Sequence, residues 1–188
     1  LPSFFRNPVE GIKVVPNWDW MTLLVLEVLF GAATGFLGGI VSRHILAVLG
    51  GLIISPISNL LLSLVTAGVL YYACLFLLKT QLDFKKVCTV VVLAKLPAEI
   101  LMIFSPMGRP LILIGILITA LLMIIGFSEN FLLERKKVTQ IVGTVAAAVA
   151  VIWLIGFFTE VANRHIKVQD YTPESLDQIH KELNENSN

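Results

Sequence analysis

Three ionisable residues lie inside apolar stretches of this sequence: Glu27, Lys95 and Glu99. A charge at the bilayer centre costs about 2.5 to 3.5 kcal/mol on insertion scales, so each of them needs a partner. Lys95 and Glu99 are four residues apart, which places them on one face of a helix, where they can pair. Glu27 and Lys95 each lie roughly 10 Å along the helix from the start of their apolar stretch, counted at 1.5 Å per residue. The spacing therefore predicts a buried charge network at one depth.

The network has two interpretations, and Pro97 bears on both. A proline at this position removes the amide that would bond to the carbonyl of Leu93, between the two charges of the same helix. Broken helices at membrane depth occur where they line a cavity, which favours a polar cavity that takes a lipid headgroup or a proton. The alternative is an ion network that only fixes helix register, and the sequence leaves both readings open.

Two stripes of small residues predict faces where helices pack closely, since small side chains let neighbouring backbones approach. The first stripe continues the face of Glu27, and the second lies near the end of the chain. The stripes consist of Gly31, Gly35 and Gly38, and of Gly143 and Ala147. A third feature, the polar edge formed by Asn59, Ser63 and Thr66, predicts hydrogen bonds to a neighbouring helix.

Motifs for metal binding and catalysis are missing from the sequence. The histidines at 44, 165 and 180 are far apart, and Cys74 and Cys88 lack metal-ligand spacing and are predicted to be packing residues. There is no HExxH, no GxSxG and no glycine-rich phosphate loop. The net charge of +1 argues against nucleic-acid binding. We therefore expect no catalytic residues, metal or cofactor.

The composition is that of a membrane protein. Of 188 residues, 56% are hydrophobic and 14% are charged, and the mean hydropathy is +0.85. A span needs about 20 apolar residues. Five segments qualify, and they predict spans at residues 20–41, 58–78, 88–104, 110–127 and 138–158.

The apolar run at residues 45–78 is too long for one straight span, at about 51 Å. Gly50, Gly51 and Pro56 predict a break, which makes residues 45–54 a short interfacial or re-entrant piece. The expected fold is thus an all-α integral membrane protein, with a bundle of five transmembrane helices, short interfacial helices and a C-terminal amphipathic helix.

The distribution of basic residues predicts the orientation. Eight basic residues fall on the side of the N-terminus and five on the opposite side, which favours a cytoplasmic N-terminus and a C-terminus outside. The expected organisation is an N-terminal cytoplasmic or interfacial segment at 1–19, the transmembrane domain at 20–158 and a polar tail at 159–188. Asn7, Pro8 and Glu10 predict the start of a short helix in the first segment, and Thr172 and Pro173 that of a helix to about residue 183.

Three stretches resemble the Yip1 family of multi-span membrane proteins, and the likeness extends over nearly the whole chain. The stretches are Phe5-Arg6-Asn7-Pro8-Val9-Glu10-Gly11 with Pro16 and Trp18; Leu82-Asp83-Phe84-Lys85-Lys86 leading to Ala94-Lys95-Leu96-Pro97; and Gly126-Phe127 before Ser128. The resemblance implies a five-helix bundle with a cytoplasmic N-terminus. Eukaryotic relatives act in vesicle trafficking and contact Rab-type GTPases through a long N-terminal region. The segment before the first span is short here, as in the bacterial branch, so we do not expect that role.

Two functions from different classes follow. The first is a non-enzymatic scaffold or adaptor in a bacterial cytoplasmic membrane, with membrane lipids as partners and other membrane proteins or a second copy of the chain as further candidates. The second is a lipid or small-solute transporter, or a scramblase, that uses the buried network of Glu27, Lys95 and Glu99.

Overall fold

A computed structural model describes residues 4, 6–41, 45–103 and 110–169. The chain divides into two compact units, residues 1–147 and 148–188. Regular structure in the described part is entirely helical, and four of its helices are long and apolar enough to cross a membrane. The protein is therefore an all-α integral membrane protein. The predicted helix at residues 172–183 lies outside the described residues.

The N-terminal helix α2 (Pro8–Lys13) begins as predicted, because the Asn7 side chain accepts a hydrogen bond of 3.2 Å from the Glu10 amide. The helix docks on α5 and α6, with Ile12 fully buried between them. Asn130 fixes this contact: its Nδ2 donates to the Ile12 carbonyl at 2.7 Å, and its Oδ1 accepts from the Val15 amide at 3.0 Å. The segment before the first span is thus attached to the bundle.

Helix α3 (Trp20–Val41) has the bounds predicted for the first span. Asp19 caps its start, since the Asp19 carboxylate accepts from the Thr22 amide at 2.9 Å and from the Thr22 hydroxyl. These bonds to Thr22 lower the pKa of Asp19, an exposed group outside the span, below its ordinary value. The cap sets where the apolar helix begins.

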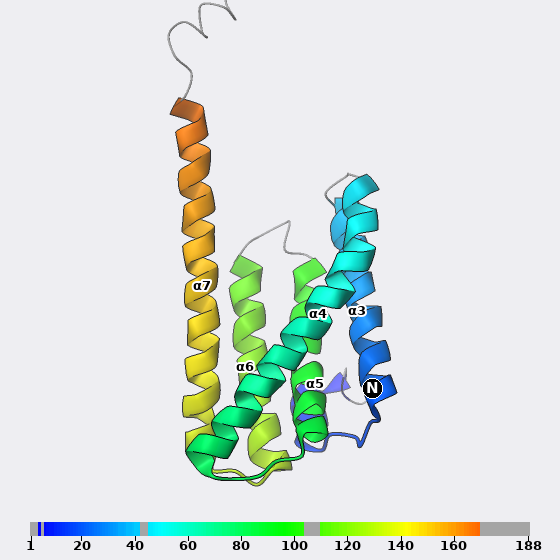
Figure 1. Cartoon of the computed structure of the whole chain (residues 1–188), viewed down its shortest axis with the longest axis vertical. Coiled ribbons are helices and arrows are strands. Elements are labelled where there is room, and N and C mark those ends of the chain that lie inside the picture. The colour runs from blue at the N-terminus through cyan, green and yellow to red at the C-terminus, as the bar shows by residue number, and fades with distance from the viewer. Residues whose placement is uncertain (1–3, 5, 42–44, 104–109, 170–188) are drawn as a thin grey trace, which may run out of the picture. The chain divides into compact units, whose positions relative to one another are not determined.

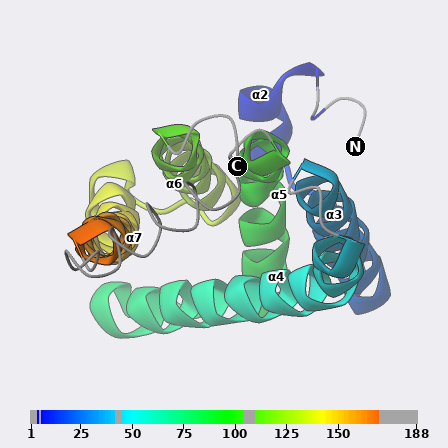
Figure 2. The same ribbon diagram turned by 90° about the horizontal axis from the view of Figure 1, so that it is seen from above.

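The predicted break at Gly50, Gly51 and Pro56 is wrong, and residues 45–54 are not a separate piece. Helix α4 (Ile45–Ala73) runs without interruption through Gly50, Gly51 and Pro56, and a π-helical turn, η1 (Cys74–Leu78), continues it. Gly51 and Pro56 serve as contact points for α3, where they allow close packing instead of a break. A helix longer than the bilayer is thick can tilt. Seen from above, α4 runs obliquely past α3 and α5 (Figure 2).

Helix α5 (Phe84–Ile103) follows a left-handed residue, Lys79, that ends the π-helical turn. It covers the predicted third span, but it is not one of the four helices that are long and apolar enough to cross a membrane. The reason is its four charged residues: Lys85, Lys86, Lys95 and Glu99. Helix α5 packs against α3, α4 and α6 (Figure 1).

Helices α6 (Pro110–Asn130) and α7 (Arg135–Gln169) contain the last two predicted spans. A short turn with Leu132 in the left-handed conformation joins them. The first part of α7 belongs to the first unit, and there Val138, Ile141 and Val142 are buried. The second unit, in its described part, is the remainder of α7 from residue 148 to Gln169.

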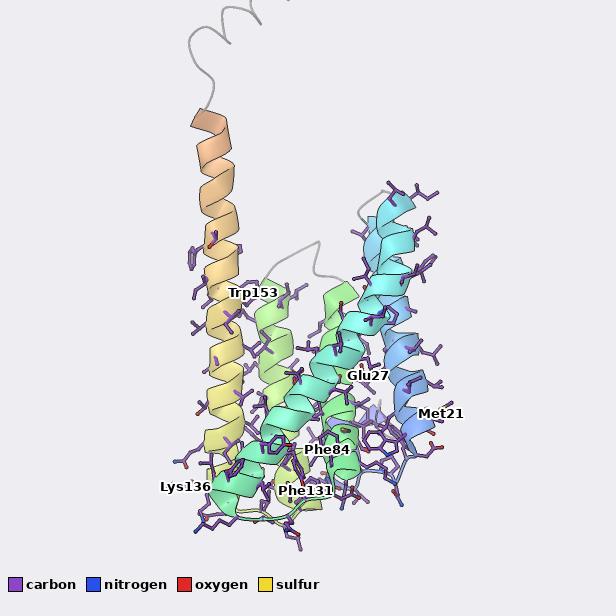
Figure 3. The ribbon with its side chains drawn as sticks, viewed as in Figure 1. Met21, Glu27, Phe84, Phe131, Lys136 and Trp153 are labelled. Atoms are coloured by element: carbon purple, nitrogen blue, oxygen red, sulfur yellow. The ribbon has the colours of Figure 1, made fainter. Side chains whose placement is uncertain are left out.

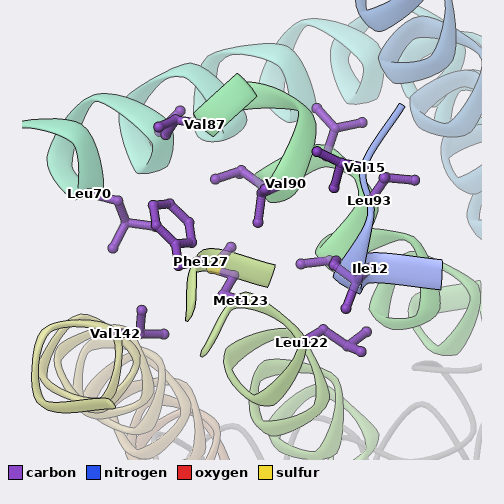
Figure 4. Close-up of a cluster of buried hydrophobic side chains, with 14 of the residues drawn as sticks. Ile12, Val15, Leu70, Val87, Val90, Leu93, Leu122, Met123, Phe127 and Val142 are labelled. Atoms are coloured by element: carbon purple, nitrogen blue, oxygen red, sulfur yellow. The ribbon is translucent and has the colours of Figure 1, made fainter. Parts of the chain in front are cut away.

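The core of the first unit is an apolar cluster around α5 and α6 (Figure 4). Phe127, 1% exposed, is the largest of the fully buried side chains. Cys74 and Cys88 belong to this cluster as free, buried thiols, which confirms them as packing residues. Other members come from α2, α4, α5, α6 and α7, among them Ile12, Leu70, Val87, Val90, Leu93, Met123 and Val142.

Candidate functional site

Lys95 lies at the centre of a buried polar network between α3, α4 and α5. Its Nζ lies 3.4 Å from Oε2 of Glu27 on α3 and 3.2 Å from Oε1 of Glu99 on its own helix. Glu27, Lys95 and Glu99 are 3%, 9% and 7% exposed. The structure thus brings together the three ionisable residues that the sequence predicted to meet, and Figure 3 shows Glu27 on the inner side of α3.

Helix α4 supplies the polar groups between the charges. The Lys95 ammonium donates to the Ser63 hydroxyl, and also to the Asn59 carbonyl at 3.4 Å. The Ser63 hydroxyl in turn donates to Oε1 of Glu27 at 2.6 Å. The predicted polar edge is therefore confirmed for Ser63, whereas Asn59 takes part through its backbone and Thr66 is half-buried.

A close approach of α3 to α4 positions Ser63 against Glu27. A Cβ atom on Gly35 would lie 2.1 Å from the Gly51 carbonyl oxygen, and one on Gly31 would lie 2.5 Å from the Pro56 Cα. These neighbours are backbone atoms, so only glycine fits at either position. The crossing lies one and two turns beyond Glu27 on the same helix face.

The predicted stripe includes one wrong member. A Cβ atom on Gly38 would meet no described atom within 4 Å, whereas Gly39 is buried. The contact face of α3 follows steps of four residues from Glu27 through Gly31 and Gly35 to Gly39.

The second predicted stripe does not form a close helix contact in the described part of the chain. A Cβ atom on Gly143 would meet no described atom within 4 Å, and Ala147 is exposed. The buried face of this part of α7 consists of the larger side chains Val138, Ile141 and Val142. Small residues permit close packing, but they do not require it.

Glu99 differs from the other members because one of its oxygens is unsatisfied. Its Oε2 atom is buried and has no hydrogen-bond partner among the described residues. The network would carry two negative charges and one positive charge if every group were ionised. A proton on Glu99 would neutralise the excess charge, since a buried and unpaired carboxylate is costly.

Pro97 lies within α5, two residues from both Lys95 and Glu99, and is half-buried. The helix continues through it to Ile103, so the proline removes one hydrogen bond without breaking the helix. The Leu93 carbonyl that this frees belongs to a residue that is buried in the apolar cluster.

Within the described residues, no group of three or more metal-ligating side chains comes together. Comparison with family models, with curated proteins and with solved structures finds no match to this chain. The arrangement of the network is therefore the main guide to function. Sequence reasoning missed the Asn59 carbonyl and the contacts of Asn130, because neither comes from a charged residue in a span.

Proposed function

We propose that this chain is a Yip1-like integral membrane protein that acts as a non-enzymatic scaffold or adaptor. In this proposal α5 is the third of five spans, and the N-terminus is cytoplasmic. The 20 residues of α5 match the length of a span at about 30 Å. Residues 87–96 are all buried, so neighbouring helices separate the charge of Lys95 from lipid.

The observation that carries the proposal is the saturation of Lys95. An ammonium group has three protons to donate. Four acceptors from three helices surround the Lys95 ammonium: Glu27, Glu99, Ser63 and the Asn59 carbonyl. A lysine so occupied has no donor left for a substrate, and its contacts join α3, α4 and α5. The network then serves to hold a bundle that presents surfaces to lipids and to other membrane proteins.

A second candidate function is transport or lipid scrambling, and one observation favours it. The unpartnered Oε2 of Glu99 is the kind of group that can accept and release a proton. If Glu99 takes up and releases a proton during a transport cycle, the network is part of the transport site, and its contacts must rearrange during the cycle.

Reconstitution in liposomes tests the choice between these functions. Purified full-length protein is placed in vesicles with a headgroup-labelled lipid and a pH-sensitive dye inside. The scaffold proposal expects lipid scrambling and proton flux at the rates of protein-free vesicles. Flux above that rate that Glu99→Gln abolishes, and that the control Glu129→Gln leaves intact, would overturn the proposal in favour of transport.

A further inference from the structure

A cavity of about 320 Å³ lies where the segment between α2 and α3 passes the start of α5. None of its lining residues belongs to the buried network of Lys95. Its size is within the range of sites for small ligands, about 300 to 1,000 Å³. The residues that line it are Val15, Pro16, Asn17, Asp83, Lys85, Lys86 and Thr89.

Among the residues that line the cavity, two are basic, Lys85 and Lys86, and one is acidic, Asp83, and the Asp19 carboxylate outside the lining also interacts with Lys85. Lys86 is held in place: its Nζ donates to the Asn130 carbonyl at 2.9 Å and lies 5.4 Å from the centroid of the Phe131 ring. These contacts leave protons of the Lys86 ammonium for a ligand. A ligand with one negative charge would balance the residues that line the cavity.

Asp83 and Thr89 shape the polar wall. One carboxylate oxygen of Asp83 accepts from the Lys85 amide at 3.0 Å, and its other oxygen can accept from a ligand. The Thr89 hydroxyl donates to the Lys85 carbonyl at 2.9 Å and is therefore committed. The cavity is thus lined by two lysines and by an aspartate with one oxygen that can accept a hydrogen bond, a combination that suits a phosphodiester with a neighbouring hydroxyl group.

Aromatic side chains beside the cavity indicate its depth. Trp20, half exposed, lies with its ring centroid 6.1 Å from that of Phe84, the first residue of α5. Tyr71 lies 5.5 Å from the same Phe84 ring. Tryptophan and tyrosine concentrate at the level of the lipid headgroups, where the phosphates of the leaflet lie.

We propose that this cavity binds the phosphodiester of an anionic phospholipid headgroup. Lys85 and Lys86 bind the phosphate, and Asp83 accepts a hydrogen bond from a headgroup hydroxyl. The inference deepens the proposed function, because it rests on α5 being a span whose first turn lies at the headgroups, and it names the lipid class that the scaffold would organise.

Short-chain lipids in detergent solution test the site. The full-length protein is titrated with dihexanoyl phosphatidylglycerol, with dihexanoyl phosphatidylcholine and with sodium phosphate. We expect phosphatidylglycerol to bind at least about tenfold more tightly than phosphatidylcholine, and Lys85→Gln to weaken it by about tenfold, the effect of one charge-assisted hydrogen bond. Lys85→Arg should retain the affinity.

Lys136→Gln is the matched control, because Lys136 is an exposed lysine that does not line the cavity. An equal loss of affinity in Lys85→Gln and Lys136→Gln would overturn the site in favour of general surface charge. Competition by sodium phosphate at the concentrations at which the lipid binds would overturn it in favour of a free anion. Flux in liposomes together with intact lipid binding would refute the scaffold function but not the lipid site. Failed lipid binding without flux would refute the lipid site but not the scaffold function.

Discussion

Helix α5 has two different surroundings along its length, and they stabilise the bundle in different ways. Towards its start, Val87, Val90 and Leu93 contribute to an apolar cluster with α2 and α6 (Figure 4). Further along, Lys95 contacts Glu27 of α3 and the Ser63 hydroxyl of α4, while Glu99 pairs with Lys95 within α5 itself. One helix thus joins an apolar core to a polar network.

The two regions should respond differently to substitution. Apolar side chains gain little by leaving lipid for other apolar side chains, so the cluster is held by van der Waals packing, which weakens in proportion to the atoms removed. A buried charge is strongly unfavourable without its partner, so a single substitution in the network should cost most of the stability that the network provides. The close backbone contact between α3 and α4 is stricter still, because no side chain can move aside there.

The largest effect is expected at the crossing of α3 and α4. In Gly35→Leu, the new Cβ would overlap the Gly51 carbonyl, and the two helices would have to separate. We expect loss of the folded protein, a destabilisation of more than about 4 kcal/mol. Size-exclusion profiles and thermal stability in detergent measure it.

Gly38→Leu is the control on the same helix, since its Cβ would meet no described atom within 4 Å. Gly38→Leu should keep the yield and stability of the parent. Equal stability of Gly35→Leu and Gly38→Leu would show that α3 and α4 do not pack closely in the membrane.

The helix positions could be predicted because apolar runs end at charged residues, turns and prolines. Helix α3 shows this best, with both ends as expected. The interior of residues 45–78 could not be predicted, since glycine and proline serve either to break a helix or to admit a neighbour. Only the position of α3 against Gly51 and Pro56 decides between these uses.

The candidate site was predictable to the extent that it depends on depth and helix register. Glu27 and Lys95 had to find partners, and counting residues placed them at one level. The hydroxyl of Ser63 was predicted to bond to another helix, but its position between the two charges depends on how α4 crosses α3. The docking of α2 by Asn130 lacked any sequence signal, because asparagine near a helix end is ordinary.

The next largest effect is expected in the network itself. Lys95→Met leaves Glu27 and Glu99 without their cation, and Glu27→Gln leaves the ammonium with one carboxylate fewer. We expect each single change to lower the free energy of unfolding by about 3 to 5 kcal/mol, the usual cost of breaking a buried ion pair. Unfolding in mixed detergent micelles measures it.

The double variant Glu27→Gln with Lys95→Met tests whether the two side chains interact directly. It should recover part of the combined loss, because residues in contact have non-additive effects. Strictly additive losses would mean that the two side chains do not interact. The polar network would then differ from the apolar cluster in residue types but not in how it stabilises the bundle.

The smallest effect is expected from a conservative change in the apolar cluster, Phe127→Leu. The Phe127 ring packs 5.5 Å from that of Phe131, and Phe127 is 1% exposed. Phe127→Leu removes part of the ring and leaves an apolar side chain, so the loss should be about 1.5 kcal/mol, rising to about 3 to 5 kcal/mol for Phe127→Ala. Phe36→Leu, at a position on α3 that is 42% exposed, is the control and should change stability by less than about 0.5 kcal/mol.

The ratio of the two Phe127 losses, measured by the same unfolding assay, is what separates a packed cluster from a network. If Phe127→Leu costs as much as Phe127→Ala, the cluster also fails at its first substitution, and the distinction between the two surroundings of α5 is lost.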